Sequence, residues 1–329
     1  MQRLGNVYHG PPNQTANAFM TTGALEYGIA LPQVYVDERI DPAAIGHFAA
    51  RAEVLGFHSV WTQDQLIGSA ATLDAVSLLS FVAARTQKVR LGVSVLVLPI
   101  RTPVPLAKSL ATLDCLSGGR LDVGLGLGNP TPHATAYGLT GARGERLRRF
   151  SDGLAVMKAL WSDGPGTVSS GHWPLEEASM EPKPVQRPHP ALWFGGRHVN
   201  ALRRAVDEGD GWMGAGSSTI DEFLEQRALV AEALDAAGRQ PETFRIAKRV
   251  YVALDANENR AEERLRSWFD RYYGNPALAS RVSVWGPASK IIDAMGRLEE
   301  GGAEMLLLNP VFDYQKHQET LSELLTHSR

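Results

Sequence analysis

The sequence lacks the features that mark several broad classes of protein. Its 329 residues include one cysteine, Cys115, which excludes an internal disulfide and a cysteine-rich metal site. The nine histidines show no ligand-like spacing, so no metal is expected. No run approaches about 18 uninterrupted apolar residues, so no membrane-spanning helix is expected. A formal net charge of −3 gives no reason to expect nucleic acid or an anionic membrane as a partner.

The beginning of the chain differs in character from the rest. It lacks a basic region followed by an apolar core, and the default expectation is therefore a cytoplasmic enzyme. Residues 1–25 are polar, aperiodic and broken by glycine and proline, which predicts a loosely ordered extension. We therefore expect this extension over residues 1–25 and a single domain over residues 26–329.

From residue 26 onward, strand patterns alternate with helical patterns. Eight apolar strands are expected, over residues 27–31, 57–62, 89–98, 120–125, 191–194, 211–213, 244–254 and 304–308. Such alternation requires a parallel sheet with right-handed crossovers. Eight repeats favour an α/β protein with a closed (β/α)8 TIM barrel. An open doubly wound sheet would need a Gly-x-Gly-x-x-Gly turn after its first strand, where this chain has Leu31-Pro32-Gln33.

Two stretches rich in glycine or proline, residues 163–190 and about 271–286, interrupt this alternation. We expect both to be irregular insertions at the C-terminal mouth of the barrel, where they would shape a substrate pocket or its lid.

In a barrel, ligands bind at the C-terminal ends of the strands. Glycines there let a backbone approach a flat or phosphorylated ligand, although any tight turn also uses them. Gly195-Gly196 precedes a helix and could form an anion cradle. Asp64 could orient a cofactor, act as a base or cap a helix, and Arg101 could clamp a phosphate or remain solvated. His133 could donate a proton from its loop, or simply be exposed.

One long segment, LGVSVLVLPIRTPVPLAKSLATLDCLSGGRLDVGLGLG, resembles the luciferase-like flavin-dependent oxidoreductases, including their deazaflavin (coenzyme F420) branch. Supporting segments are YGIALP, AEVLGFHSVW, PKPVQRPHPALWFGG and GAEMLLLNP, and the likeness covers about residues 26–325. It implies a (β/α)8 barrel that holds reduced FMN or F420 in its mouth. It also implies a non-proline cis peptide at Ser94-Val95, behind the cofactor ring.

The resemblance, together with the strand-end rule, gives a set of cofactor-binding candidates. They are Ser94, Val95, Leu96, Arg101, Gly126, Leu127, Gly128, Asn129, Phe194, Gly195 and Gly196.

Two departures from the family pattern affect the expected chemistry. Family members commonly have a histidine after the acidic residue at the end of the second strand, where this chain has Asp64-Gln65. Glutamine can hydrogen-bond a substrate or a cofactor ring but cannot shuttle a proton near neutral pH, so proton transfer would fall to another group such as His133. The catalytic candidates are therefore Asp64, Gln65 and His133. Luciferases proper place an arginine for the FMN phosphate at the position of Leu127, so F420 is slightly favoured.

We therefore expect hydride transfer to, or monooxygenation of, a small organic substrate by a reduced flavin-type cofactor. The alternative is a non-catalytic flavin-binding barrel that has lost its acid–base residue. The resemblance also leaves a homodimer open.

Overall fold

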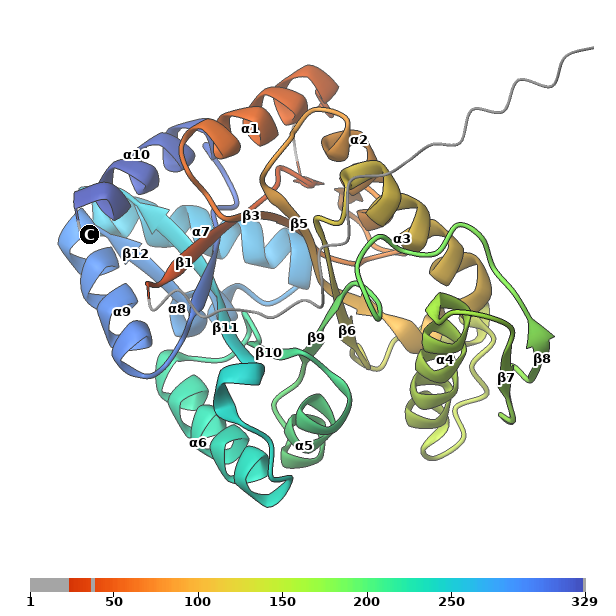
Figure 1. The fold of residues 1–329 in the computed structure, drawn as a ribbon. Helices are drawn as coiled ribbons and strands as arrows, with labels where there is room; N and C mark the ends of the chain where they lie inside the picture. The colour runs from red at the N-terminus through yellow and green to blue at the C-terminus, as the bar shows by residue number, and fades with distance from the viewer. Residues whose placement is uncertain (1–23, 37–38, 328–329) are drawn as a thin grey trace, which may run out of the picture.

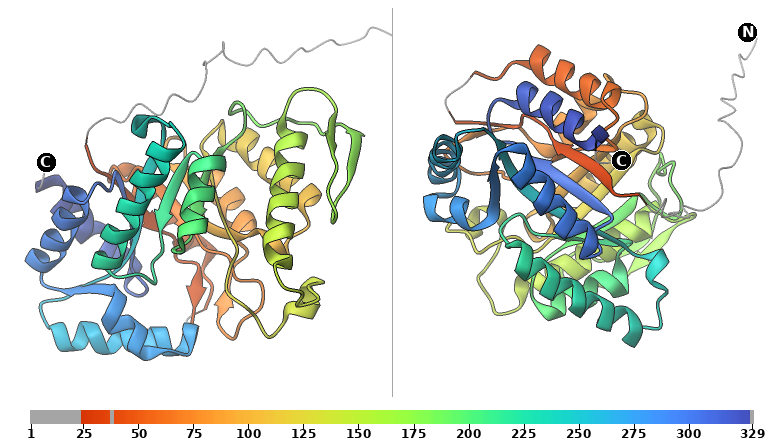
Figure 2. Two further views of the ribbon diagram at one scale, coloured as in Figure 1. Left: turned by 90° about the horizontal axis from the view of Figure 1, so that it is seen from below. Right: turned by 90° about the vertical axis from the view of Figure 1, so that its left-hand side faces the viewer.

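The computed structural model describes residues 24–36 and 39–327. The extension predicted over residues 1–25 therefore lies almost wholly outside the described residues. From residue 24 onward, the chain forms strands enclosed by helices (Figure 1, Figure 2).

Eight parallel strands form the closed barrel that the sequence predicts. Each strand pairs in parallel register with its neighbours, and the pairing of β10 with β11 closes the ring. The order around the barrel is β1 (Glu26–Ala30), β3 (Ser59–Thr62), β5 (Arg90–Val97), β6 (Leu121–Gly126), β9 (Ala191–Gly195), β10 (Gly211–Gly214), β11 (Arg245–Leu254) and β13 (Met305–Asn309).

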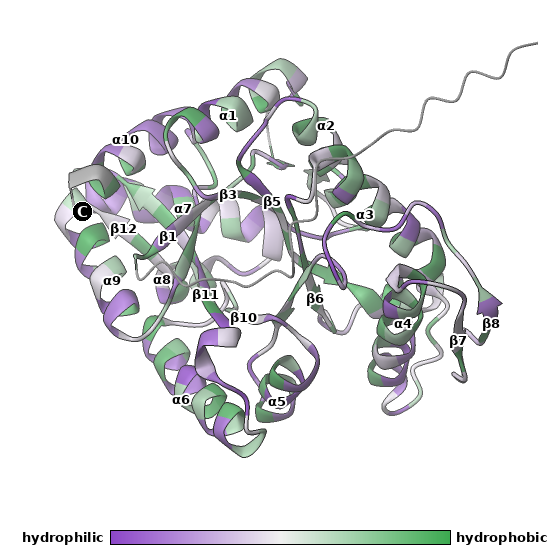
Figure 3. Cartoon of the chain, viewed as in Figure 1, coloured by the Kyte–Doolittle hydropathy of each residue, from purple (hydrophilic) through white to green (hydrophobic). Residues whose placement is uncertain are grey.

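The helices lie outside this ring and connect successive strands (Figure 1). They are α1 (Pro42–Val54), α2 (Ala75–Ala83), α3 (Pro103–Ser117), α4 (Glu145–Trp161), α5 (Val199–Glu208), α6 (Ile220–Ala236), α7 (Glu258–Tyr273), α8 (Pro276–Val282), α9 (Ala288–Glu300) and α10 (Tyr314–His327). Short 3-10 turns are η1 (Leu98–Ile100), η2 (Ala134–Tyr137) and η3 (Pro241–Thr243). Apolar and polar residues alternate along the helices (Figure 3), and the apolar ones pack on the strands.

The two insertions are more regular than expected. Residues 163–190 contain an antiparallel hairpin, β7 (Gly166–Val168) and β8 (Leu175–Ala178). Residues 271–286 contain α8 and a further strand, β12 (Ser283–Gly286), which pairs in parallel with the C-terminal half of β11. A second small hairpin joins β2 (Val34–Tyr35) to β4 (Ala71–Thr72). The sequence signal was misleading because glycine and proline mark the ends of short elements as well as irregular loops.

Two tryptophans fill the middle of the barrel. Trp61 and Trp193 are buried, and their rings meet edge to face with centroids 6.2 Å apart. Glycines make room for them, because a Cβ on Gly92 would lie 2.2 Å from Trp61 and one on Gly211 would lie 2.8 Å from Trp193. This pair, called here the tryptophan floor, closes the interior below the C-terminal mouth.

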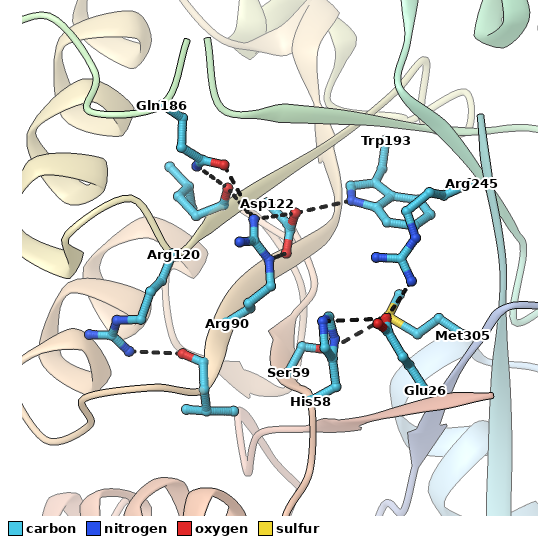
Figure 4. A network of polar contacts seen from close by, with 12 residues as sticks. Glu26, His58, Ser59, Arg90, Arg120, Asp122, Gln186, Trp193, Arg245 and Met305 are labelled. Atoms are coloured by element: carbon cyan, nitrogen blue, oxygen red, sulfur yellow. Dashed lines mark hydrogen bonds and ion pairs between the residues drawn. The ribbon is translucent and has the colours of Figure 1, made fainter. Parts of the chain in front are cut away.

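Below the tryptophan floor, ion pairs fill the N-terminal end of the barrel (Figure 4). Arg90 binds Asp122 through two hydrogen bonds, of 2.7 and 2.9 Å, and Trp193 donates to the same carboxylate at 3.3 Å. Burial would raise the pKa of Asp122, but the neighbouring Arg90 charge lowers it below its ordinary value. Arg245 forms ion pairs with Glu26 and Glu304. Arg90 and Arg245 in this network therefore each have a carboxylate partner.

Candidate functional site

A cavity of about 910 Å³ opens at the C-terminal ends of the barrel strands. Its wall comes from strand ends and from the loops and helices that follow them. The lining residues are Gln63, Asp64, Gln65, Ser94, Val95, Gly126, Leu127, Gly128, Asn129, Phe150, Phe194, Gly195, Gly196, Arg197, His198, Ala201, Arg204, Met213, Gly214, Ala215, Gly216, Ser217, Arg249, Tyr251, Tyr272, Tyr273 and Leu278.

Most of the predicted cofactor-binding residues lie together in this wall. They are Ser94, Val95, Gly126, Leu127, Gly128, Asn129, Phe194, Gly195 and Gly196. The predicted non-proline cis peptide is present between Ser94 and Val95. The insertion at residues 271–286 contributes Tyr272, Tyr273 and Leu278, but the insertion at 163–190 contributes nothing. The insertion at residues 163–190 packs beside α3 instead, where the side-chain amide of Gln186 donates to Asp114 and to the Leu121 carbonyl.

The glycines at this mouth serve a purpose that the sequence analysis did not foresee. A Cβ on Gly126 would lie 2.6 Å from the Val95 side chain, and one on Gly195 would lie 3.1 Å from it. A Cβ on Gly128 would lie 2.4 Å from Val97, and this glycine has a φ of +62°. The missing side chains thus make room first for Val95 and Val97 of β5, and Val95 forms part of the cavity wall.

Leu96 does not belong to the cavity. Ser94 and Val95 both line it, while Leu96 is fully buried in the layer between strands and helices. The register of β5 on β6 shifts between Val93 and Leu96. Side-chain alternation therefore breaks at this point, which strand periodicity alone cannot show.

Arg101 also lies outside the lining, so the structure gives no support for a phosphate clamp there. Its guanidinium binds both carboxylate oxygens of Asp64, with Nε 3.0 Å from Oδ2, and reaches Asp74 at 3.3 Å. The Asp64 carboxylate also accepts from the Val97 amide at 2.9 Å, and its side chain is only 1 % exposed. This pair fixes the turn after β5, and it leaves the carboxylate no free position from which to act as a base.

The other two catalytic candidates differ in position. Gln65 lines the cavity, but its amide oxygen accepts from the Thr72 hydroxyl at 3.1 Å. His133 is exposed before η2 and is absent from the cavity wall. The sequence analysis overestimated His133 because a loop that follows a barrel strand can turn away from the mouth.

Basic residues after β9 form one side of the opening, called here the basic rim. It consists of Arg197, His198 and Arg204, on and before α5. The α5 helix begins at Val199, three residues after Gly196, so its N-terminal backbone N–H groups lie near the same region. Gly196 has a φ of +151°, and a Cβ there would lie 2.7 Å from Ala201. This end of the cavity suits a phosphate group.

Sequence reasoning missed Arg249, which lines the deep part of the cavity. It donates to the Ser94 carbonyl at 3.2 Å, to the Tyr251 hydroxyl at 3.1 Å, and to the Asn309 side-chain oxygen at 2.8 Å. It also donates to the side-chain oxygen of Gln63. The sequence contained a signal for this residue. In the segment RIAKRVYVAL, the adjacent cations Lys248 and Arg249 lie within a mostly apolar strand.

Sequence reasoning also missed a group of tyrosines beside Arg249. Tyr272 accepts a hydrogen bond from the Gln63 amide nitrogen at 2.8 Å. The hydroxyls of Tyr251 and Tyr273 lie 2.6 Å apart. The pKa values of Tyr272 and Tyr273 lie above the ordinary tyrosine value, for Tyr272 because of its burial, so both tyrosines stay neutral in the physiological range. They belong to the end of α7, which the sequence analysis treated only as the edge of an insertion.

A buried lysine supports the wall after β10. Lys248 is 2 % exposed, and its ammonium group donates to the carbonyls of Ala215 and Ser218 and to the Ser218 hydroxyl. Burial lowers its pKa from 10.5 to about 7, while the charge of Glu222 opposes that change. The lysine thereby holds the loop that carries cavity residues Ala215 to Ser217.

Within residues 24–36 and 39–327, no group of three or more histidine, cysteine, aspartate or glutamate side chains is arranged to hold a metal ion. In the same part of the chain, no helix is both long and apolar enough to cross a membrane.

Comparisons with known proteins agree with this architecture. The F420-dependent glucose-6-phosphate dehydrogenase of Kineococcus radiotolerans is 30% identical over 240 residues, which are 70% of each chain. The oxygenase component of the flavin-dependent trigonelline monooxygenase of Acinetobacter baylyi is 28% identical over 162 residues, 47% of this chain and 43% of that protein. A solved F420-dependent secondary alcohol dehydrogenase, in complex with an F420–acetone adduct, superposes with a TM-score of 0.81 at 21% identity. That superposition covers 93% of this chain and 99% of the other.

The family model described as luciferase-like monooxygenase matches residues 21–306, which is most of the chain. The matched region includes seven of the eight barrel strands and every residue that lines the cavity. The chain therefore belongs to the luciferase-like monooxygenase family.

Proposed function

We propose that this protein is an oxidoreductase that uses reduced coenzyme F420 to transfer a hydride to a small organic substrate. The observation that carries the proposal is the cavity itself. It is walled by Val95 and glycine on one side and bordered by the basic rim. A flat ring with a phosphate-bearing tail fits such a combination of surfaces.

The residues of the cavity fit the two parts of such a cofactor. The Ser94-Val95 segment offers an apolar surface with no Cβ on Gly126 or Gly195 to obstruct it. The basic rim and the N-terminus of α5 offer charge and N–H donors for the phosphate. When bound, the reduced deazaflavin would supply the hydride.

In the proposed reaction, Tyr272 takes the role of the missing histidine as proton donor. Its oxygen accepts from the Gln63 amide, so its own O–H is available to donate. Arg249 in turn binds the side-chain oxygen of Gln63, which fixes the amide orientation and polarises it. As the hydride reaches a substrate carbonyl carbon, the Tyr272 hydroxyl gives its proton to the carbonyl oxygen, and water restores it afterwards.

The choice of F420 over FMN is supported by two facts. The named relative with the longer match is F420-dependent, and the turn after β6 carries Leu127 where an arginine for the FMN phosphate would stand. The second candidate is monooxygenation with reduced FMN, which the flavin-dependent monooxygenase relative favours. Nothing in the cavity favours the non-catalytic alternative, because its wall retains a proton donor. A homodimer and a cytoplasmic location stay predictions.

Cofactor binding tests the proposal directly. The melting temperature of the purified protein is measured with F420 and with FMN, each oxidised and reduced, at equal concentrations. We expect F420 to raise it more than FMN does. Turnover is then measured with reduced F420 and a panel of small carbonyl compounds. The proposal is wrong if neither cofactor shifts the melting temperature, and the second candidate replaces it if only FMN does.

A further inference from the structure

We propose that Arg249 forms the centre of an anion-binding subsite, and that the substrate carries a carboxylate attached to an aromatic-sized ring. This subsite, called here the arginine subsite, consists of Arg249 with Gln63, Tyr251, Tyr272 and Asn309. The inference rests on the proposed function only in assigning the ligand to the substrate.

Among the described residues, the Arg249 guanidinium donates hydrogen bonds only to neutral oxygens, and it also lies 5.0 Å from the centroid of the Tyr251 ring. Its partners are the Ser94 carbonyl, the side-chain amides of Gln63 and Asn309, and the hydroxyl of Tyr251. Its Nε is buried and has no hydrogen-bond partner among the described residues. Arginine offers five N–H donors and carries its charge at every physiological pH, so an unfilled donor and an uncompensated charge are present together.

No carboxylate of the described chain forms an ion pair with Arg249, although other buried arginines have such partners. Arg90 has Asp122, Arg245 has Glu26, and Arg101 has Asp64. Among the residues that the structure describes, Asp64 is the one acidic residue that lines the cavity, and Arg101 binds both of its oxygens. The neighbouring tyrosines hold their protons and provide no negative charge. Burying a cation without a partner costs several kcal/mol, and a bound anion offsets that cost.

The arginine subsite is distinct from the basic rim. Arg249 lies on β11 and reaches across to β3, β5 and β13, through Gln63, Ser94 and Asn309. The basic rim lies on and before α5, after β9. The cavity thus has two cationic regions, and the phosphate of one cofactor accounts for only the rim.

The surroundings of the arginine subsite indicate the shape of its ligand. Tyr272 and Tyr273 form the side of the cavity next to Arg249, and Leu278 completes it. Trp268 stacks behind Tyr272, with ring centroids 4.8 Å apart, and holds that tyrosine in place. Flat apolar walls beside a guanidinium suit a ring that bears a carboxylate.

Binding of benzoate to the full-length, cofactor-free protein tests this proposal. Affinity is measured by isothermal titration calorimetry at constant ionic strength, with benzamide as the neutral compound of the same shape. We expect benzoate to bind at least tenfold more tightly than benzamide. R249Q is expected to weaken benzoate binding at least tenfold and to leave benzamide binding within twofold. R266Q, which changes an exposed arginine of α7 outside the cavity, is expected to change neither affinity.

Three results would overturn the proposal: equal affinity of benzoate and benzamide, unchanged benzoate binding in R249Q, or competition between benzoate and oxidised F420 or FMN. Competition would place the guanidinium in the cofactor site instead. If a cofactor binds but benzoate does not, the arginine subsite fails and the proposed function stands. If benzoate binds in the expected way but neither cofactor does, the subsite stands without the proposed function.

Discussion

Strand β11 carries two arginines in opposite circumstances, one at the N-terminal end of the barrel and one at its C-terminal mouth. Arg245 and Arg249 lie four residues apart in one strand, so their side chains leave the same face. At the N-terminal end, Arg245 meets Glu26 and Glu304. At the C-terminal end, Arg249 meets only neutral oxygens, and no carboxylate of the described residues pairs with it. A closed ion-pair network stabilises the fold, whereas an open cation is available to a ligand.

The same contrast appears in the side chains around the two arginines. At the N-terminal end, Asp122 has both oxygens engaged by Arg90 and also accepts from Trp193 (Figure 4). At the C-terminal end, the Tyr272 hydroxyl accepts one bond and faces a cavity. In (β/α)8 barrels the C-terminal face carries chemistry and the N-terminal face carries stability, and here one strand shows both.

The largest expected effect comes from Y272F at the C-terminal end. Removing the hydroxyl removes the proposed proton donor, and we expect turnover to fall by about 10²- to 10⁴-fold. Rates with reduced cofactor are measured across pH, together with cofactor affinity and melting temperature. Affinity and melting temperature are expected to stay near their wild-type values. A loss of rate of less than tenfold would contradict the role of proton donor. A loss of cofactor affinity as large as the loss of rate would contradict it as well.

At the N-terminal end, D122N is expected to act on stability instead. It leaves Arg90 buried without a carboxylate, and breaking a buried pair in this way costs about 3–5 kcal/mol. Because the folded-state pKa of Asp122 is lowered, the wild-type pair stabilises the fold at neutral pH and is lost as the solution becomes acidic. Urea unfolding from pH 3 to pH 7 measures both effects. D122N should lack part of the acid dependence, and its F420 affinity should not change.

The barrel itself was predictable from the sequence because its strands are dense in apolar and β-branched residues. Each of the eight expected strands overlaps an observed one. The strand-end rule then located Gly126 and Gly195, which lie at the ends of β6 and β9, while the family resemblance indicated Ser94. Local sequence was sufficient at these positions.

Other parts of the site depend on contacts between distant segments. Nothing near Arg101 in the sequence shows that Asp64, 37 positions away, occupies its guanidinium. The strand-end rule did not select Arg249, because this residue lies inside β11. The strand extends beyond the barrel to pair with β12, so its last residue is not at the cavity. Tyr272 reaches the cavity from the end of a helix, where periodicity describes the helix and not its neighbour.

Lys248 provides a smaller test at the C-terminal end. Below about pH 7, this lysine is protonated in the folded and unfolded chains alike, since its pKa is lowered to about 7 only in the folded state. Between that pH and about 10.5, the folded chain holds one proton fewer, so stability should rise with pH by up to about 1.4 kcal/mol per unit. Denaturant unfolding of wild type and K248M, compared from pH 6.5 to 9, measures the slope. Equal slopes would show that Lys248 stays charged among its oxygen partners.

The smallest expected effect is that of R249Q on stability, and its difference from the effect of R245Q most directly tests the comparison. R245Q leaves Glu26 and Glu304 without their shared cation, and the pKa of Glu304 is already raised by burial. We expect R245Q to lower the free energy of unfolding by about 3 kcal/mol or more.

R249Q removes a charge that has no carboxylate partner among the described residues, and water entering the cavity can satisfy the oxygens it leaves. The free energy of unfolding should therefore change by less than about 1 kcal/mol, or rise. Urea unfolding of wild type, R245Q and R249Q at pH 7 measures these two changes in the free energy of unfolding. If R249Q loses as much stability as R245Q, then Arg249 is a structural residue like Arg245, and the two ends of the barrel do not differ in how their arginines are used.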